Sequence, residues 1–137
     1  MDRLSCILLV DDDQTTTYLS QLLLERCNVA DKILVASNGR AALDLLLQLP
    51  AGAAPSLILL DVHMPVMDGY AFAEAYAQLP AATRQALVVV MLTTPLHPAS
   101  AARLQQHNVL AFVQKPLNAD KLSRLLRTHF SGSVSVR

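Results

Sequence analysis

Short apolar runs alternate with longer segments of helical periodicity along the whole chain. Five runs have the length and composition of buried strands: about Cys6–Val10, Lys32–Ala36, Leu57–Leu60, Leu87–Leu92 and Leu110–Val113. The segments that follow them place apolar residues three and four positions apart, as amphipathic helices do. Five strands and five helices in strict alternation predict an α/β domain with one parallel sheet.

Helix boundaries can be predicted from the residues that start and stop helices. The first helix is expected over about Gln14–Cys27, with helical spacing at Tyr18, Leu19, Leu22, Leu23 and Arg26. The second should open at Asn38-Gly39, with an apolar face of Ala42, Leu43, Leu46 and Leu47. Asp68 is a plausible N-cap for a helix to about Gln78, and Pro98 suits the first turn of the next. Asn118 should cap a last helix that ends near His129.

Four of the apolar runs end on residues that can carry chemistry. The first leads into Asp11-Asp12-Asp13, the third into Asp61, the fourth into Thr93 and the fifth into Lys115. The carboxyl ends of parallel strands lie along one edge of a sheet, and ligands bind outside that edge. The pattern therefore brings carboxylates, a hydroxyl and an ammonium together.

These groups suit a divalent cation and a phosphoryl group. Clustered carboxylates repel one another, and a cation between them allows them to ionise together. An all-oxygen site with few protein ligands favours Mg²⁺, which keeps several waters and accepts phosphate oxygens. One carboxylate can then act as a nucleophile towards phosphorus, while the metal neutralises developing charge and the lysine offers a compact positive charge.

Each feature taken alone has a simpler interpretation. The three aspartates could serve as a helix cap and first-turn acids, and Asp61 could be an Asx-turn residue before Pro65. Thr93 and Lys115 would be ordinary loop residues. The joint pattern is more specific than its parts, because every one of these residues follows a strand directly.

Length and charge narrow the class of protein. The 137 residues suit one domain, expected over residues 1–130, with a polar and frayed tail at 131–137. The 11 basic and 11 acidic residues give a net charge of zero, which does not favour nucleic acid or anionic membrane as a partner. No signal peptide or membrane-length apolar stretch is present. Cys6 and Cys27 are expected to be buried, reduced thiols, which agrees with a cytoplasmic protein.

Five motifs in order resemble the receiver domains of bacterial two-component signalling, of the chemotaxis-response-regulator type. They are Ile7–Asp13, Asn38–Leu43, Leu57–Gly69 with the sequence LILLDVHMPVMDG, Met91–Thr93 and Lys115–Leu117. The resemblance covers essentially the whole chain. It implies a doubly wound, flavodoxin-like fold with the strand order 2-1-3-4-5.

The resemblance also implies a role for each site residue. Asp61 would be the phosphoacceptor, and Asp12 and Asp61 would ligate Mg²⁺ directly with help from Asp11. The backbone carbonyl of His63 would be the remaining protein ligand. Lys115 would pair with a phosphoryl oxygen, and its peptide bond to Pro116 would be cis. Thr93 would be the switch hydroxyl and Phe112 the switch aromatic.

The chain departs from the family pattern in several loops. Thr94 is bulkier than usual, and Pro95 and Pro98 stiffen the segment after the fourth strand. Asn108 replaces a glycine, for which it is the natural substitute because it tolerates positive φ. The resemblance implies that His63 and Pro95 flank the path of water to an acyl phosphate, which favours a long-lived phosphorylated state unless His63 positions that water.

The function that follows is a stand-alone phospho-receiver. It would take a phosphoryl group on Asp61 from a sensor histidine kinase or a histidine phosphotransfer protein, and it would signal by docking to a downstream protein that the sequence does not identify. It would catalyse only its own Mg²⁺-dependent phosphorylation and dephosphorylation. The alternatives are a non-switching phosphate carrier in a phosphorelay, a phosphatase of the haloacid-dehalogenase type using Asp11-Asp12-Asp13, and a degenerate receiver used only for binding.

Overall fold

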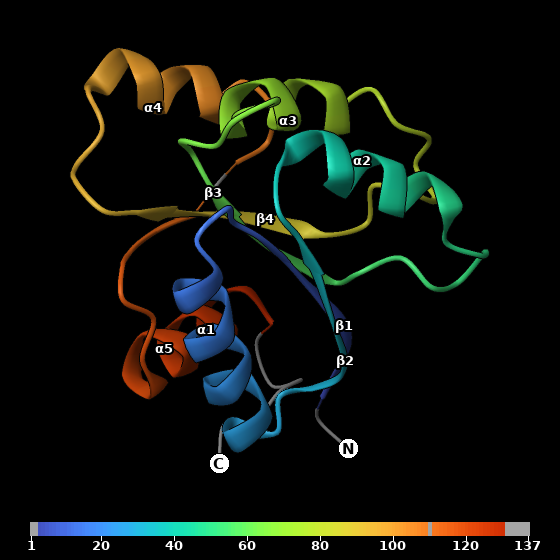
Figure 1. Ribbon diagram of the computed structural model, residues 1–137, viewed down its shortest axis with the longest axis vertical. Helices are drawn as coiled ribbons and strands as arrows, with labels where there is room; N and C mark the ends of the chain where they lie inside the picture. The colour runs from blue at the N-terminus through green and yellow to red at the C-terminus, as the bar shows by residue number, and fades with distance from the viewer. Residues whose placement is uncertain (1–2, 110, 131–137) are drawn as a thin grey trace.

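The sheet has five parallel strands in the order β2-β1-β3-β4-β5, as predicted (Figure 1). This computed structural model describes residues 3–109 and 111–130. The strands are β1 Leu4–Val10, β2 Ala30–Ala36, β3 Leu57–Asp61, β4 Leu87–Leu92 and β5 Ala111–Gln114. The chain adds β2 on one side of β1 and then crosses back to β3 on the other side. The topological switch point therefore lies between β1 and β3, where open α/β sheets bind ligands.

Five helices cover the two faces of the sheet, with α2, α3 and α4 on one face and α1 and α5 on the other (Figure 1). They are α1 Gln14–Cys27, α2 Gly39–Gln48, α3 Gly69–Tyr76, α4 Pro98–Gln105 and α5 Ala119–His129. Among the helices of the described residues, none combines the length and apolarity needed to cross a membrane.

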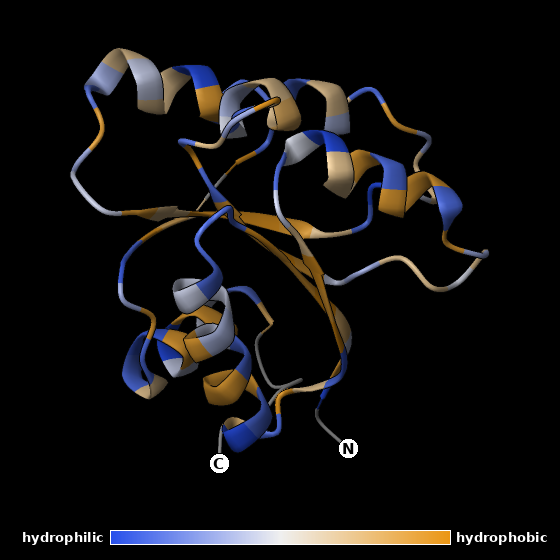
Figure 2. Ribbon diagram, in the orientation of Figure 1, coloured by the Kyte–Doolittle hydropathy of each residue, from blue (hydrophilic) through white to orange (hydrophobic). Residues whose placement is uncertain are grey.

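Each central strand is buried on both faces, which is why the strands are continuous apolar runs in the sequence. Side chains at alternate positions point to opposite faces. Leu8, Ile58 and Val88 pack under α2, α3 and α4, whereas Leu9, Leu59 and Val89 pack under α1 and α5. In Figure 2 the central strands are accordingly the most uniformly hydrophobic part of the ribbon.

The strand register brings the carboxyl ends level with one another. Val10 lies opposite both Ala36 and Leu60, Leu60 lies opposite Val90, and Val90 lies opposite Phe112. The polar residues that follow these positions therefore leave the sheet along a single edge. This alignment is what places the candidate site.

Side-chain caps start the helices where the sequence predicts them. Asn38, Asp68 and Asn118 each accept a hydrogen bond from the backbone N–H three residues later, which satisfies an otherwise unpaired donor of the first turn. His97 caps α4 through Nδ1, which accepts from the Ala99 amide at 3.1 Å, and Pro98 occupies the first turn. Asn108 has the predicted positive φ, at 67°.

Two predicted apolar faces are wrong in part. In α2, Leu47 is 58% exposed. The buried side of this helix is formed by Gly39, Ala42, Leu43 and Leu46. Because an α-helix has 3.6 residues per turn, Leu47 points roughly 90° away from the centre of that side. In α1 the buried residues are Thr17, Leu24 and Cys27, so Tyr18 and Leu19 turn towards solvent with 60% and 58% exposure.

Several boundaries also differ from the sequence-based expectation. β1 begins at Leu4 and β2 at Ala30, because Leu4 pairs with Ala30 and its N–H donates to the Val29 carbonyl at 2.8 Å. α3 ends at Tyr76 instead of about Gln78. Cys6 and Cys27 are buried free cysteines, as predicted. Leu110, the expected first residue of the last strand, and the predicted tail at 131–137 lie outside the described residues.

Candidate functional site

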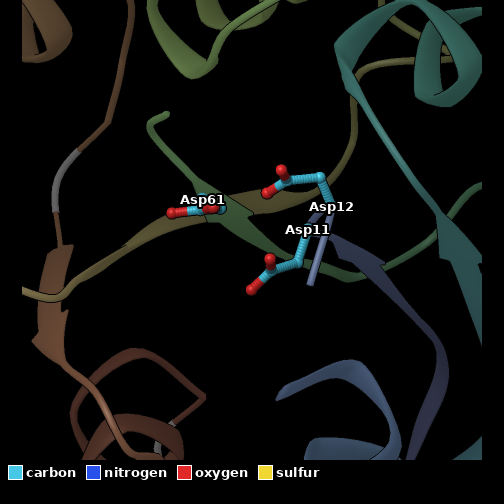
Figure 3. Close-up of side chains that lie close together, drawn as sticks. All are labelled: Asp11, Asp12 and Asp61. Carbon is cyan, nitrogen blue, oxygen red and sulfur yellow. The ribbon is translucent and has the colours of Figure 1, made fainter. Parts of the chain in front are cut away.

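Three carboxylates meet at the switch point of the sheet. Asp11 and Asp12 directly follow β1, and Asp61 is the last residue of β3 (Figure 3). One oxygen from each of the three carboxylates lies within 4.8 Å of the others. The sequence separates Asp61 from Asp11 by 50 positions, and the pairing of β1 with β3 brings them together.

The three consecutive aspartates divide into two roles. Asp13 is the N-cap of α1, and its Oδ1 accepts from the amides of Thr15 at 2.9 Å and Thr16 at 3.2 Å. Asp11 Oδ1 accepts from the Asp13 amide at 2.9 Å, which shapes the turn from strand to helix. The simple capping interpretation therefore holds for Asp13 alone, while Asp11 and Asp12 belong to the carboxylate cluster.

Asp61 is held by its own loop. Its Oδ1 accepts from the Val62 amide at 2.9 Å, and the Gly69 amide donates to the Val62 carbonyl at 2.7 Å, which closes the loop onto α3. The Asp61 side chain is 14% exposed. The Asp61 carboxylate is thus held in one orientation and remains partly accessible to solvent.

Lys115 comes to the cluster from the end of β5. Its Nζ lies 2.9 Å from Asp11 Oδ2 and 3.5 Å from Asp61 Oδ1. The Lys115 amide donates to the Leu92 carbonyl at 2.7 Å, and the peptide bond to Pro116 is cis, as the resemblance implied. Lys121 Nζ donates to the carbonyls of Gln114 and Pro116 at 2.8 and 3.0 Å, which secures this turn to α5.

Burial and charge shift the proton affinities in the cluster. Burial, followed by the Asp11 charge, raises the pKa of Asp61 above its ordinary value, although Lys115 and the Val62 amide act in the opposite direction. Burial lowers the pKa of Lys115, but the hydrogen bond and charge of Asp11, together with Asp61, outweigh burial and raise it. Ionisation of Asp61 is therefore less favourable than that of a free carboxyl group, and Lys115 stays protonated.

Two of the remaining predicted site residues border a hollow with Asp61, and the third lies elsewhere in the sheet. His63 and Thr93 are exposed, and they line a small hollow with Asp61, Thr94 and Leu96, of about 30 Å³. Phe112 is half-buried on β5 and packs against the core under α2, α3 and α4. The structure thus places Thr93 at the same hollow as Asp61, whereas Phe112 lies on β5, two strands from the β3 strand that carries Asp61.

Sequence reasoning missed a group of hydroxyls on α1. Thr16, Thr17 and Ser20 line a second hollow that also borders Asp11, Asp61 and Lys115. The signal was available in the sequence as a run of three threonines in the first turns of a helix, with a serine one turn later. The apolar periodicity of the segment concealed it.

The residues present fit Mg²⁺ by their chemistry. The cluster offers only carboxylate oxygens, and Asp12 is exposed to solvent. Mg²⁺ prefers this kind of sparse oxygen set over an enclosed all-protein cage.

Comparison with known proteins identifies the family. The response regulator receiver domain family matches residues 7–127. This chain belongs to that family. The receiver domain assignment accounts for both the strand order and the motif around Asp61, so the haloacid-dehalogenase alternative is set aside.

Relatives of this receiver domain come from several kinds of signalling protein. The probable methanogenesis regulatory protein FilR2 of Methanothrix harundinacea is 32% identical over 121 residues, which is 86% of this chain and 76% of FilR2. The two-component response regulator ARR10 of Arabidopsis thaliana is 29% identical over 87% of this chain, but the match spans 20% of ARR10. The sensor histidine kinase GacS of Pseudomonas protegens is 31% identical over 88% of this chain and 12% of GacS.

A solved structure has the same fold. The two-component response regulator from Cytophaga hutchinsonii superposes with a TM-score of 0.81 at 26% identity, covering 92% of this chain and 96% of that one. The match thus spans most of some of these chains and a small part of others.

Proposed function

We propose that this receiver domain accepts a phosphoryl group on Asp61. The observation that carries the proposal is the convergence of Lys115 Nζ, 3.5 Å from Asp61 Oδ1, with a cluster of three carboxylates at the carboxyl edge of the sheet. The Lys115 ammonium is positioned to bind an oxygen of a phosphoryl group on Asp61, and the remaining carboxylates are positioned to hold a cation beside it.

The transfer is a displacement at phosphorus. An Asp61 carboxylate oxygen forms a bond to phosphorus while the bond from phosphorus to a histidine nitrogen of the donor breaks, and the departing imidazole takes up a proton from solvent. Lys115 moves its charge from Asp61 towards a phosphoryl oxygen. Thr93, on the other side of Asp61, donates its hydroxyl hydrogen to another phosphoryl oxygen.

Mg²⁺ would be held by Asp12 and Asp61, with help from Asp11 and with the backbone carbonyl of His63. When bound, it neutralises charge on the transferring group. The protein residues would hold the Asp61 carboxylate in place and leave the site accessible to the phosphohistidine of the donor protein.

The donor would be a sensor histidine kinase or a histidine phosphotransfer protein, docking beside α1 in the cytoplasm. Tyr18 and Val35 are exposed apolar side chains that border a hollow of about 300 Å³ shared with Asp11 and Asp12. Leu19 is a further exposed apolar side chain of α1. An apolar surface at the rim of the site gives a phosphohistidine-bearing protein a place to bind.

The output would be a change of shape read by a downstream protein. Phosphorylation would draw Thr93 towards the phosphoryl group, and Phe112 would turn into the space released. A ligand shifts a two-state equilibrium only by its differential affinity for the two states. Here the new bond from Thr93 and the charge pair with Lys115 supply that difference.

Phosphorylation itself can be tested with acetyl phosphate and Mg²⁺, read by intact mass. We expect one added phosphoryl group in the wild type, none in Asp61→Asn, and none when EDTA removes the cation. Asp13→Asn is a matched control one residue from the cluster, because asparagine also caps helices and the change should leave phosphorylation intact. Equal modification of the Asp61→Asn protein would overturn the assignment.

Switching is tested separately with beryllofluoride, a phosphoryl mimic. Amide chemical shifts in β5 and α4 should move in the wild type, and most of that movement should be lost in Thr93→Ala but kept in Thr93→Ser. If only residues beside Asp61 move, the chain is a non-switching phosphate carrier, and the docking output is wrong.

A further inference from the structure

A small hollow on the α1 side of the sheet is separate from the open side of the site. Its volume is about 30 Å³, and its polar lining residues are Thr16, Thr17 and Ser20 of α1 together with Asp11, Asp61 and Lys115. None of the roles proposed above uses these hydroxyls.

Thr17 is the unusual member of this group. It is 8% exposed and is the only polar or charged residue among the described buried residues. Its Oγ1 is buried and has no hydrogen-bond partner among the described residues. A buried hydroxyl without a partner destabilises the fold, and native proteins avoid it or satisfy it with ordered water.

The hollow has the size and lining for one water molecule. A volume of about 30 Å³ exceeds the minimum of roughly 10–15 Å³ that a buried water needs, and such a water makes about three hydrogen bonds. Thr17, its α1 neighbours Thr16 and Ser20, and Lys115 are the polar side chains of this lining that could bond such a water, beside Asp11 and Asp61. The ammonium has three N–H donors, and Asp11 and Asp61 accept at most two of them.

We propose that the hollow binds one ordered water that links the Thr17 hydroxyl to the Lys115 ammonium, so that Thr17 is a positioning residue for phosphoryl transfer. The proposal rests on the proposed function of Lys115. During transfer the ammonium leaves Asp61 for a phosphoryl oxygen, and the water supplies a fixed third contact about which the ammonium turns. Thr17 therefore acts through Lys115 and does not touch the phosphoryl group.

Three variants test this link. Thr17→Val keeps the shape of the side chain and removes the hydroxyl, Thr17→Ser keeps the hydroxyl, and Thr15→Val makes the same change at an exposed position in the first turn of α1. For each, the maximal rate and KM of phosphorylation by acetyl phosphate are measured with saturating Mg²⁺, together with Mg²⁺ affinity by calorimetry and the Tm in EDTA.

We expect Thr17→Val to lower the maximal rate about fivefold, the equivalent of one lost hydrogen bond, with KM and Mg²⁺ affinity unchanged. Thr17→Ser should restore the rate, and Thr15→Val should behave as wild type. The Tm of Thr17→Val should fall, because the water loses an anchor. A high-resolution crystal structure should show a water within hydrogen-bond distance of Thr17 Oγ1 in the wild type.

The opposite results overturn the proposal. If the hollow is dry, Thr17→Val removes an unpaired buried hydroxyl, so its Tm should rise and its phosphorylation rate should equal that of wild type. Failure of the wild type to accept phosphate would instead count against the proposed function. The Tm comparison and the crystal structure need no phosphodonor, so they would still decide whether the water is bound.

Discussion

Gly69 lies directly against the backbone of Asp61. A Cβ atom at position 69 would be 2.5 Å from the Asp61 carbonyl oxygen and 2.8 Å from the Cα of Val62. Both neighbours are backbone atoms at the end of β3, so neither can swing aside. The start of α3 is therefore part of the support that holds the candidate acceptor.

Gly69→Ala should destabilise the protein by about 2 kcal/mol or more, since extra atoms forced against fixed backbone typically cost roughly 1–3 kcal/mol. It should also slow phosphorylation, because relief of the clash moves Asp61. Urea unfolding and acetyl phosphate kinetics measure the two effects. Gly52→Ala is the control, because Gly52 has a positive φ of 84° but open space around it. This substitution should lower the free energy of unfolding by only about 1 kcal/mol. The prediction would be contradicted if Gly69→Ala destabilised the protein no more than Gly52→Ala does.

Asp61→Asn should stabilise the metal-free protein at neutral pH. Folding raises the pKa of Asp61 above its ordinary value of 3.8, mainly through burial and then through the Asp11 charge. The folded state thus binds that proton more tightly than the unfolded state, and the stability of the wild type falls as pH rises through the interval between the ordinary and the raised pKa.

At pH 7 in EDTA, Asp61→Asn should raise the free energy of unfolding by about 1 kcal/mol, within the range of stabilising changes at functional sites. This gain should vanish below the ordinary pKa of 3.8, where Asp61 is protonated in both states. Urea unfolding at a series of pH values measures it. Asp44→Asn, which removes an exposed charge paired with Arg40, should give no gain at any pH. A gain in Asp61→Asn that is the same at pH 3 and pH 7 would show that charge is not the cause.

Mg²⁺ should stabilise the fold in a concentration-dependent way. The cation should relieve the repulsion among the carboxylates of Asp11, Asp12 and Asp61. A ligand that binds only the folded state raises the free energy of unfolding by about 2.7 kcal/mol when its concentration is a hundred times its Kd. The Tm should rise steadily with Mg²⁺, and the rise should be lost in Asp12→Ala but kept in Asp13→Asn. A Tm that is equal in EDTA and in excess Mg²⁺ would refute the cation site.

Val66→Gly should stabilise the loop after β3. Val66 has a φ of 69° and sits in a tight turn in which the Met67 amide donates to the Pro65 carbonyl at 2.7 Å. Positive φ is strained for a β-branched residue, and the side chain is 83% exposed, so little packing is lost on its removal. We expect a gain of about 1 kcal/mol by urea unfolding. Val66→Ala retains a Cβ and should gain clearly less; an equal gain would mean that exposure, not backbone strain, is the cause.

The phosphorylated state should be long-lived. His63 is exposed and lines the hollow beside Asp61 with Thr94, whereas Pro95 follows Thr94 and cannot donate a hydrogen bond to water. Loss of phosphate from Asp61 should be slow in the wild type and faster in Pro95→Glu, which brings a group able to orient water. Fast loss in the wild type that slows in His63→Ala would show instead that His63 assists hydrolysis.

The fold could be predicted from the sequence because its signals are local. A strand buried on both faces must be apolar throughout, so β1, β3 and β4 are visible as runs, and the residues that cap α2, α3 and α5 follow from the need to pair the first amides of a helix. The candidate site could be predicted for a related reason: parallel strands end at one edge, so residues that follow apolar runs must gather there. Neither inference needs the detailed packing of side chains.

Tertiary structure alone decided how those residues are used. The side of α1 that packs depends on how the helix lies against the sheet, so Tyr18 and Leu19 face solvent and Thr17 is buried, contrary to what apolar periodicity suggests. The division of labour within Asp11-Asp12-Asp13 depends on a turn that sends Asp13 to the helix and Asp11 to Lys115. The raised pKa of Asp61 depends on burial and on a charge 50 positions away in the chain. These are properties of distances between segments, which a linear pattern of residues does not contain.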